Sequence, residues 1–184
     1  MNMLASRGQL RASFIRWALF IVPLVVLLGF LAGKLGSPDS AWFASLAKPA
    51  IFPEPKWFGI VWTVLYVMIG FAVAIVAAAW GARGRTDALA VFALHFVLNL
   101  SWSYVFFGAQ QITWGLILLG LILITLIALV VLFWRVRRLA GLLLLPYLAW
   151  VCFATLLNYQ FLALNPDADG GYPDGAVERV RIGN

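Results

Sequence analysis

The stretch from Ala88 to Trp134 contains no Asp, Glu, Lys or Arg, and this feature constrains the fold most strongly. A transmembrane helix needs about 20 apolar residues, so the stretch is too long for one span. The segment GAQQ (residues 108–111) divides it into two. The whole chain is 64% hydrophobic and 11% charged, whereas soluble domains carry about 25% charged residues. The sequence therefore predicts an integral membrane protein.

Three further apolar runs bring the predicted number of membrane spans to five. The predicted helices cover about residues 17–36, 57–82, 88–107, 112–134 and 139–164. We expect an all-α bundle of five transmembrane helices that forms one domain over residues 1–166. A polar and flexible C-terminal tail is expected over residues 167–184. No small-residue cleavage site precedes Lys34, so we expect the first run to be a retained helix and not a signal peptide.

Basic residues lie mainly on one side of the predicted membrane. The amino terminus and the loops after the second and fourth helices hold Arg7, Arg11, Arg16, Arg83, Arg85, Arg135, Arg137 and Arg138. The opposite side has Lys48 and Lys56 in its first loop, and Arg179 and Arg181 in a tail that also carries acidic residues. The positive-inside rule then predicts a cytoplasmic amino terminus, with the bacterial inner membrane as the expected location. This topology explains the net charge of +6, and no nucleic-acid partner is expected.

Polar and aromatic side chains recur at helical spacing on three predicted helices. They are Trp62 and Tyr66 on the second helix; His95, Asn99, Trp102 and Phe106 on the third; and Tyr147, Trp150, Ala154 and Asn158 on the fifth. Residues three or four apart share one helix face. Amide and imidazole groups are unfavourable against lipid tails, so these faces should turn into the bundle. All three lie near the same side of the membrane, which predicts a ligand pocket; packing between helices is the alternative explanation.

The loop before the second helix contains three prolines within seven residues: Pro49, Pro53 and Pro55. Proline fixes φ and lowers the entropy of ordering a loop. The loop lies on the same side of the membrane as the predicted pocket. We therefore interpret it as a semi-rigid lid that includes Pro49, Phe52 and Pro53.

Conventional catalytic groups are missing from the predicted spans. They contain no paired carboxylates, metal-ligand cluster or nucleophilic triad, so acid–base or hydrolytic catalysis is not expected. We expect neither a bound metal nor a required cofactor. His95 is the only histidine. A neutral imidazole is able to ligate haem iron, although a hydrogen bond to a neighbouring helix is the more common role.

Three segments resemble, in order and spacing, the translocator protein family, also called tryptophan-rich sensory proteins (TspO/MBR). They read WFASLAKPAIFPEPKWFGIVWTVLY (residues 42–66), NLSWSYVFFGAQQITW (99–114) and LLPYLAWVCFATLLNYQF (144–161). The resemblance implies a five-helix bundle, often a homodimer, with a pocket for porphyrins, sterol-like lipids and benzodiazepine-type drugs. The matching pocket positions are Trp62, Tyr66, Asn99, Trp102, Trp114, Trp150, Ala154 and Asn158, with Pro49 and Pro53 in the lid.

The sequence departs from the family pattern in the lid and after the last helix. Ile51 and Glu54 occupy one aromatic and one proline position of the family lid, which puts drug affinity in doubt. No basic residue follows Tyr159 within five positions, so the weak sterol pattern is absent and cholesterol is not expected. Gly29 and Gly33 have the spacing of a close-packing motif, but they do not locate a dimer interface.

The resemblance leaves three functions open. The first is a sensor or carrier that binds a porphyrin such as protoporphyrin IX, or another hydrophobic ligand, beneath the first loop. The second is light-dependent protoporphyrin degradation, for which Trp62 and Trp150 would be the catalytic residues. The third is a transporter of lipids or small molecules. No charged residue crosses the predicted bundle to couple an ion gradient, which argues against active transport.

Overall fold

The computed structural model describes residues 7–36 and 38–171. The described chain contains α1 (Arg7–Gly33), α2 (Ala41–Ser45), α3 (Pro55–Ala77), α4 (Arg85–Ser103), the π-helix η1 (Tyr104–Gly108), α5 (Ile112–Val136) and α6 (Arg138–Leu164). With η1 continuing α4, five of these helical segments are long and apolar enough to cross a membrane. The prediction of an all-α, five-helix membrane bundle is confirmed.

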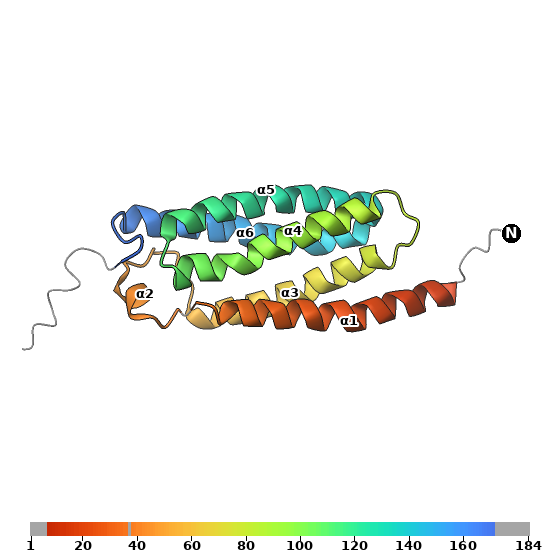
Figure 1. Ribbon diagram of the computed structural model, residues 1–184, viewed down its shortest axis with the longest axis horizontal. Coiled ribbons are helices and arrows are strands. Elements are labelled where there is room, and N and C mark those ends of the chain that lie inside the picture. The colour runs from red at the N-terminus through yellow and green to blue at the C-terminus, as the bar shows by residue number, and fades with distance from the viewer. Residues whose placement is uncertain (1–6, 37, 172–184) are drawn as a thin grey trace, which may run out of the picture.

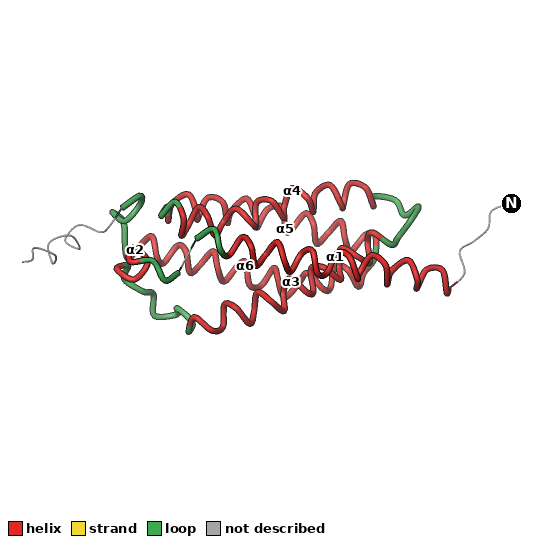
Figure 2. Tube along the Cα trace, turned by 60° about the horizontal axis from the view of Figure 1, so that its bottom comes forward, coloured by secondary structure: helices red, strands yellow, loops and turns green. Residues whose placement is uncertain are grey.

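The five long helices lie side by side in an elongated bundle (Figure 1). Helix α1 packs on α3, α3 on α6, α6 on α5 and α5 on α4, and α4 returns to α1. Small residues allow the closest approaches: a Cβ on Gly70 of α3 would lie 2.8 Å from the Cα of Val22 in α1. Figure 2 shows that the connecting loops gather at the two ends of the bundle, with the short helix α2 among the loops of one end.

Two helix boundaries differ from their predicted positions for identifiable reasons. Helix α3 ends at Ala77 and not near residue 82, because the chain turns through Gly81 and Gly84, whose φ angles are +74° and +76°. The Arg85 guanidinium also satisfies the end of α3, donating from Nε and Nη2 to the Ala77 carbonyl at 3.0 and 2.8 Å. Within the described residues, helix α1 is already helical at Arg7, ten residues before the predicted start near 17, because a helix does not need apolar residues beyond the membrane.

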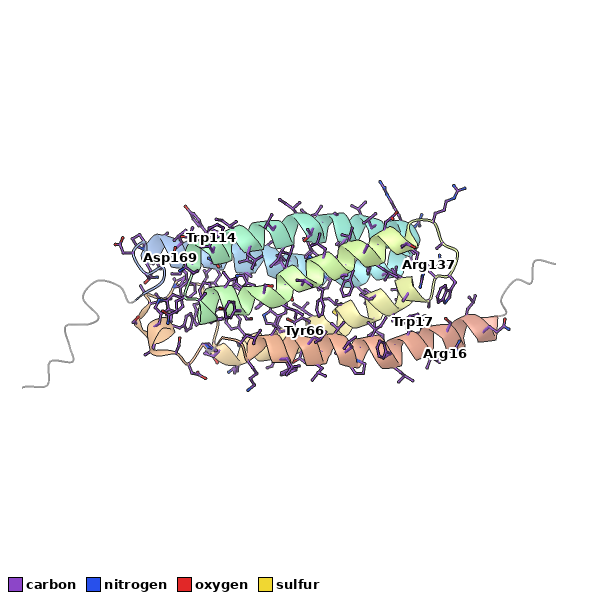
Figure 3. All side chains as sticks on the ribbon, viewed as in Figure 1. Arg16, Trp17, Tyr66, Trp114, Arg137 and Asp169 are labelled. Atoms are coloured by element: carbon purple, nitrogen blue, oxygen red, sulfur yellow. The ribbon has the colours of Figure 1, made fainter. Side chains whose placement is uncertain are left out.

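The basic residues predicted to share one side of the membrane belong to one end of the bundle. Figure 3 shows Arg16 and Arg137 towards this end and Asp169 at the opposite end. The start of α1, the α3–α4 connection and the α5–α6 junction all lie at the basic end. The described residues of the α1–α3 connection (34–36 and 38–54), which we call the lid, lie at the other end with α2.

Candidate functional site

The end of the bundle that carries the lid contains a cavity of about 520 Å³. Residues of α1, α3, α4, η1, α5 and α6 line it, together with Phe43 and Phe52 of the lid. Nine residues of the predicted helix faces and lid are among them: Phe52, Trp62, Tyr66, Asn99, Trp102, Phe106, Trp150, Ala154 and Asn158. The polar and aromatic faces of three helices therefore meet at one hollow beneath the first loop.

Aromatic rings form one wall of this cavity. Trp62 stacks on Tyr66 with ring centroids 5.1 Å apart, as expected for residues four apart on α3. Trp150 of α6 meets the edge of Phe58 at 5.8 Å, and Phe58 in turn contacts Phe52 of the lid at 5.5 Å. Flat, electron-rich surfaces therefore face the cavity from α3, α6 and the lid.

Trp114 is one of the predicted pocket residues that the structure places away from the cavity. Its side chain is 61% exposed on the outside of α5 and does not line the cavity (Figure 3). It is the third residue of α5, whose neighbours Ile112 and Gly115 are buried instead. The position is therefore a lipid-facing one near a helix end, where interfacial tryptophans are common. The assignment of Trp114 to the pocket was wrong.

His95 and Tyr147 lie behind the cavity wall and not on it. Tyr66 Oη donates to Asn99 Oδ1 at 3.3 Å, and Asn99 Nδ2 donates to Tyr147 Oη at 2.8 Å. Tyr147 Oη lies 2.9 Å from His95 Nε2, and His95 Nδ1 lies 2.9 Å from Thr125 Oγ1. This polar chain connects the cavity to α5 through the middle of the bundle.

The directions of the bonds in this chain follow from the groups at its far end. The Thr125 hydroxyl donates to helix carbonyls of its own helix, 2.9 Å away at Leu121, so its oxygen accepts from His95 Nδ1–H. His95 Nε2 then accepts the proton of Tyr147 Oη. Both ring nitrogens of His95 are thus engaged. The geometry therefore supports a role for His95 in hydrogen bonding between helices. It does not support haem ligation, because neither ring nitrogen is free to bind iron.

The π-helix η1 continues α4 at the level of the lid. It contains Phe106 and Phe107, whose ring centroids lie 4.8 Å apart, and Phe106 stacks on Trp102 at 5.1 Å. The lid crosses this turn closely, because a Cβ on Gly36 would lie 2.5 Å from the Ser103 carbonyl oxygen. Single π-helical turns are frequent at functional sites. Here the turn adds two aromatic rings to the cavity wall.

The lid is tied down by the residues that follow α6. Trp42 Nε1 donates to the Ala168 carbonyl at 3.0 Å, and the Trp42 side chain is fully buried. Asn165 pairs with both backbone groups of Ala47: Oδ1 accepts from its N–H at 2.8 Å, and Nδ2 donates to its C=O at 3.0 Å. Asp169 caps α5, accepting from the N–H of Ile112 at 2.5 Å. Residues 165–170 therefore form an ordered clasp, and the expectation of a flexible tail does not hold for residues 167–170.

The remainder of that predicted tail, residues 172–184, lies outside the described residues. Arg179 and Arg181, counted in the charge bias, belong to it.

Pro49 and Pro53 do not line the cavity, whereas Pro38 of the lid and Pro55 at the start of α3 do. Pro49 is buried and Pro53 half-buried, and only Phe52 of the three predicted lid members lines the cavity.

Lys48 donates to the carbonyls of Phe43 and Leu46, and its ammonium lies 4.0 Å from the centroid of the Phe43 ring. Although the Lys48 side chain is exposed overall, burial of its ammonium end lowers the pKa from its usual value.

Several lining residues were not identified from the sequence. Phe43, Phe58, Phe107 and Phe161 line the cavity, but phenylalanine occurs throughout the spans and gives no distinguishing pattern. Gly29 also lines it, and its place in the motif GFLAG was a usable signal for a close approach. Among the described residues, no group of three or more His, Cys, Asp or Glu side chains is arranged to hold a metal ion.

Comparison with known proteins places these features in a family. The model of the TspO/MBR family matches residues 20–164, which includes every cavity-lining side chain. The chain belongs to the TspO/MBR family. It is 37% identical over 147 residues to the tryptophan-rich protein TspO of Chlorobaculum tepidum, covering 79% of this chain and 93% of that protein.

Two other TspO/MBR relatives extend the comparison. The translocator protein of Homo sapiens is 40% identical over 153 residues, covering 74% of this chain and 88% of that protein. The tryptophan-rich sensory protein of Cereibacter sphaeroides is 34% identical over 151 residues, covering 81% and 92%. The resemblance read from three sequence segments is confirmed at the level of the family.

Proposed function

We propose that this TspO/MBR protein is a membrane receptor that binds a porphyrin, such as protoporphyrin IX, in the cavity beneath its lid, and acts as a sensor or carrier. The observation that carries the proposal is the meeting of Trp62, Tyr66 and Trp150 around one cavity of about 520 Å³. Ligand pockets of about 300–1,000 Å³ with apolar walls and a few polar groups are typical of small-molecule sites. A flat, conjugated macrocycle matches the stacked aromatic wall.

The cavity offers such a ligand both apolar and polar contacts. Indole and phenyl rings stack on the macrocycle face, while the amide side chains of Asn99 and Asn158 supply hydrogen-bonding groups at the wall. The exposed residues Phe30 and Gly33 at the end of α1, and Lys34 at the start of the lid, also line the cavity. They form an entry between α1 and the lid. One relative is named a sensory protein, which supports a role in sensing.

The topology proposed for the chain follows from its charge. The basic end of the bundle is cytoplasmic under the positive-inside rule, so the lid and cavity face the other side of a bacterial inner membrane. A homodimer is the proposed assembly, by analogy with the family.

A titration tests the proposal directly. Protoporphyrin IX added to purified protein in detergent should quench tryptophan fluorescence with an affinity in the low-micromolar range or tighter. The double variant Asn99→Leu, Trp150→Ala should bind about tenfold more weakly or worse, because it removes a stacking ring and a polar wall group. Equal affinity of this variant and the wild type for protoporphyrin would show that the porphyrin does not bind in this cavity.

Light-dependent degradation of protoporphyrin is a second candidate function. It is favoured by one observation: the indoles of Trp62 and Trp150 both line the cavity, on helices α3 and α6. Illumination of the loaded protein should then bleach the porphyrin Soret band in the wild type, but not in the variant Trp62→Phe, Trp150→Phe. If protoporphyrin binds but its Soret band is not bleached, the degradation function is ruled out and the receptor function is retained.

A further inference from the structure

A second hollow lies at the basic end of the bundle, away from the cavity beneath the lid. It has a volume of about 370 Å³ and is lined by Ser13, Arg16, Trp17 and Phe20 of α1 and by Trp80, which follows the end of α3. None of these residues lines the first cavity. Arg16 and Trp17 lie towards the basic end in Figure 3. The hollow is therefore separate from the site described above.

The four lining residues of α1 share one face of the helix, because they are spaced by three, one and three positions. The face is polar at Ser13 and Arg16 and aromatic at Trp17 and Phe20, and it extends over about 10 Å at a rise of 1.5 Å per residue. From Trp17 to Gly33 the helix carries no charged residue. The polar half of the hollow therefore lies at the level of the lipid headgroups, and the aromatic half lies where the hydrocarbon begins.

Trp80 forms the wall of the hollow opposite α1. Its ring centroid lies 6.4 Å from that of Trp17, and the Arg85 guanidinium lies 4.1 Å from the centroid of the Trp80 ring. The same guanidinium donates to the Ala77 carbonyl at the end of α3. A cation over an indole face is a favourable contact. Although Trp80 is 65% exposed, its ring is therefore held in place by Arg85.

The charge around the hollow is positive. No hydrogen bond or ion pair with another described residue engages the Arg16 guanidinium. Asp87, in the first turn of α4, is the only carboxylate that the described part of the chain places at this end, whereas Arg11, Arg83 and Arg135 add positive charge there. An unpaired cation in a positive field favours an anionic ligand.

We propose that this hollow binds the headgroup of an anionic phospholipid in the leaflet that meets the basic end of the bundle. The Arg16 guanidinium and the Ser13 hydroxyl donate to the phosphate oxygens, and an acyl chain passes Phe20 into the hydrocarbon. A guanidinium suits a phosphate because its planar donors form two parallel hydrogen bonds. The indoles of Trp17 and Trp80 lie beside the headgroup, at the level that tryptophan prefers in membranes.

Two features of the hollow favour this class of ligand over related ones. Its aromatic half continues into the hydrocarbon layer, where an acyl chain is present and a soluble phosphate is not. The positive field at this end also disfavours a zwitterionic headgroup, since that headgroup brings its own ammonium next to Arg16. The hollow therefore matches a phosphate that is both anionic overall and attached to a lipid.

Native mass spectrometry of the full-length protein in detergent tests the proposal. Dioleoyl phosphatidylglycerol and dioleoyl phosphatidylcholine have the same acyl chains, and the wild type should bind the anionic lipid about tenfold more tightly. Arg16→Gln keeps a polar side chain but removes the charge, and it should lose most of this preference. Arg138→Gln makes the same change at an exposed arginine outside the hollow, at the start of α6, and should retain it.

A second variant blocks the hollow without changing any charge. Ser13→Leu fills the polar half with an apolar side chain and should also abolish the preference for phosphatidylglycerol. The melting temperature of each variant, measured on the same samples, reports whether the bundle is folded. Inorganic phosphate, added in excess, should not displace the bound lipid.

Four outcomes would overturn the inference. The first is equal binding of the two lipids by the wild type. The second is an equal loss of preference in Arg16→Gln and Arg138→Gln, which would assign the effect to overall surface charge. The third is an unchanged preference in folded Ser13→Leu. The fourth is displacement of phosphatidylglycerol by inorganic phosphate, which would make the hollow a site for soluble anions.

Discussion

Gly29 of α1 lies directly against the ring of Tyr66 on α3, where a Cβ on the glycine would stand 2.5 Å from the tyrosine Cζ. Tyr66 in turn stacks on Trp62 and donates to Asn99. Because Gly29 has no side chain, the Tyr66 ring can pack against α1, and this contact sets its position in the cavity wall. Gly33, four residues later, has nothing within 4 Å of its Cβ position. The two glycines of one motif therefore have different roles.

Gly29→Ala should destabilise the protein by about 1–3 kcal/mol, because the methyl group overpacks the contact between α1 and the Tyr66 ring. Thermal unfolding in detergent, followed by circular dichroism, measures the change. Gly33→Ala is the matched control and should leave the melting temperature unchanged or slightly higher. A similar decrease of the melting temperature in both variants would mean that the two glycines are needed for helix pairing in general and not for the contact with Tyr66.

Asn165→Ala should loosen the lid, because it removes three hydrogen bonds: two with the backbone of Ala47 and one to the Phe161 carbonyl. A typical hydrogen bond of this kind contributes about 0.5–1.5 kcal/mol to stability. Hydrogen exchange of the lid amides should accelerate, and protoporphyrin should dissociate faster. The exposed neighbour Asp167, changed to alanine, provides the control. An unchanged exchange rate in Asn165→Ala would show that the lid is held by its apolar contacts alone.

Tyr147→Phe should destabilise the bundle by about 1–3 kcal/mol, since its hydroxyl is the shared partner of Asn99 Nδ2 and His95 Nε2. Tyr66→Phe removes only one long bond of 3.3 Å and should cost about 1 kcal/mol or less. Chemical or thermal unfolding of the two variants gives the comparison. A larger effect of Tyr66→Phe would contradict the order of the polar chain described above.

Trp150→Leu should weaken protoporphyrin binding about tenfold, because the indole faces the cavity and stacking on a macrocycle depends on a flat ring. Trp114→Leu makes the same chemical change at a side chain that faces outwards, and it should leave the affinity unchanged. Fluorescence quenching by protoporphyrin measures both. Loss of affinity in Trp114→Leu alone would return that residue to the binding site.

The sequence was sufficient to predict the bundle and the polar and aromatic helix faces that meet at the cavity. Long uncharged runs define spans through the length that a membrane requires. Asn99, Trp102, Trp150 and Asn158 were placed correctly against the cavity, because polar groups at helical spacing have to avoid lipid.

Features that depend on backbone geometry or on distant partners were not predictable in the same way. Trp114 was misplaced because a tryptophan near a helix end suits the membrane interface as well as a pocket. The π-helical turn at Tyr104–Gly108 leaves no signal in hydrophobic periodicity. The sequence of the clasp, residues 165–170, is typical of a polar tail. Its order comes from contacts with Ala47 and the start of α5, which are distant in the sequence and leave no local pattern.

The clasp also has a consequence for biogenesis. Trp42 is synthesised 126 residues before Ala168, its hydrogen-bond partner. During membrane insertion the first loop therefore emerges long before the chain that closes over it exists. Contacts of such long sequence separation are slow to form, because the entropy of closing a long loop has to be overcome first. The mouth of the nascent bundle stays unsealed until the last helix is complete, so a hydrophobic ligand present at that stage can be enclosed as the protein finishes assembly.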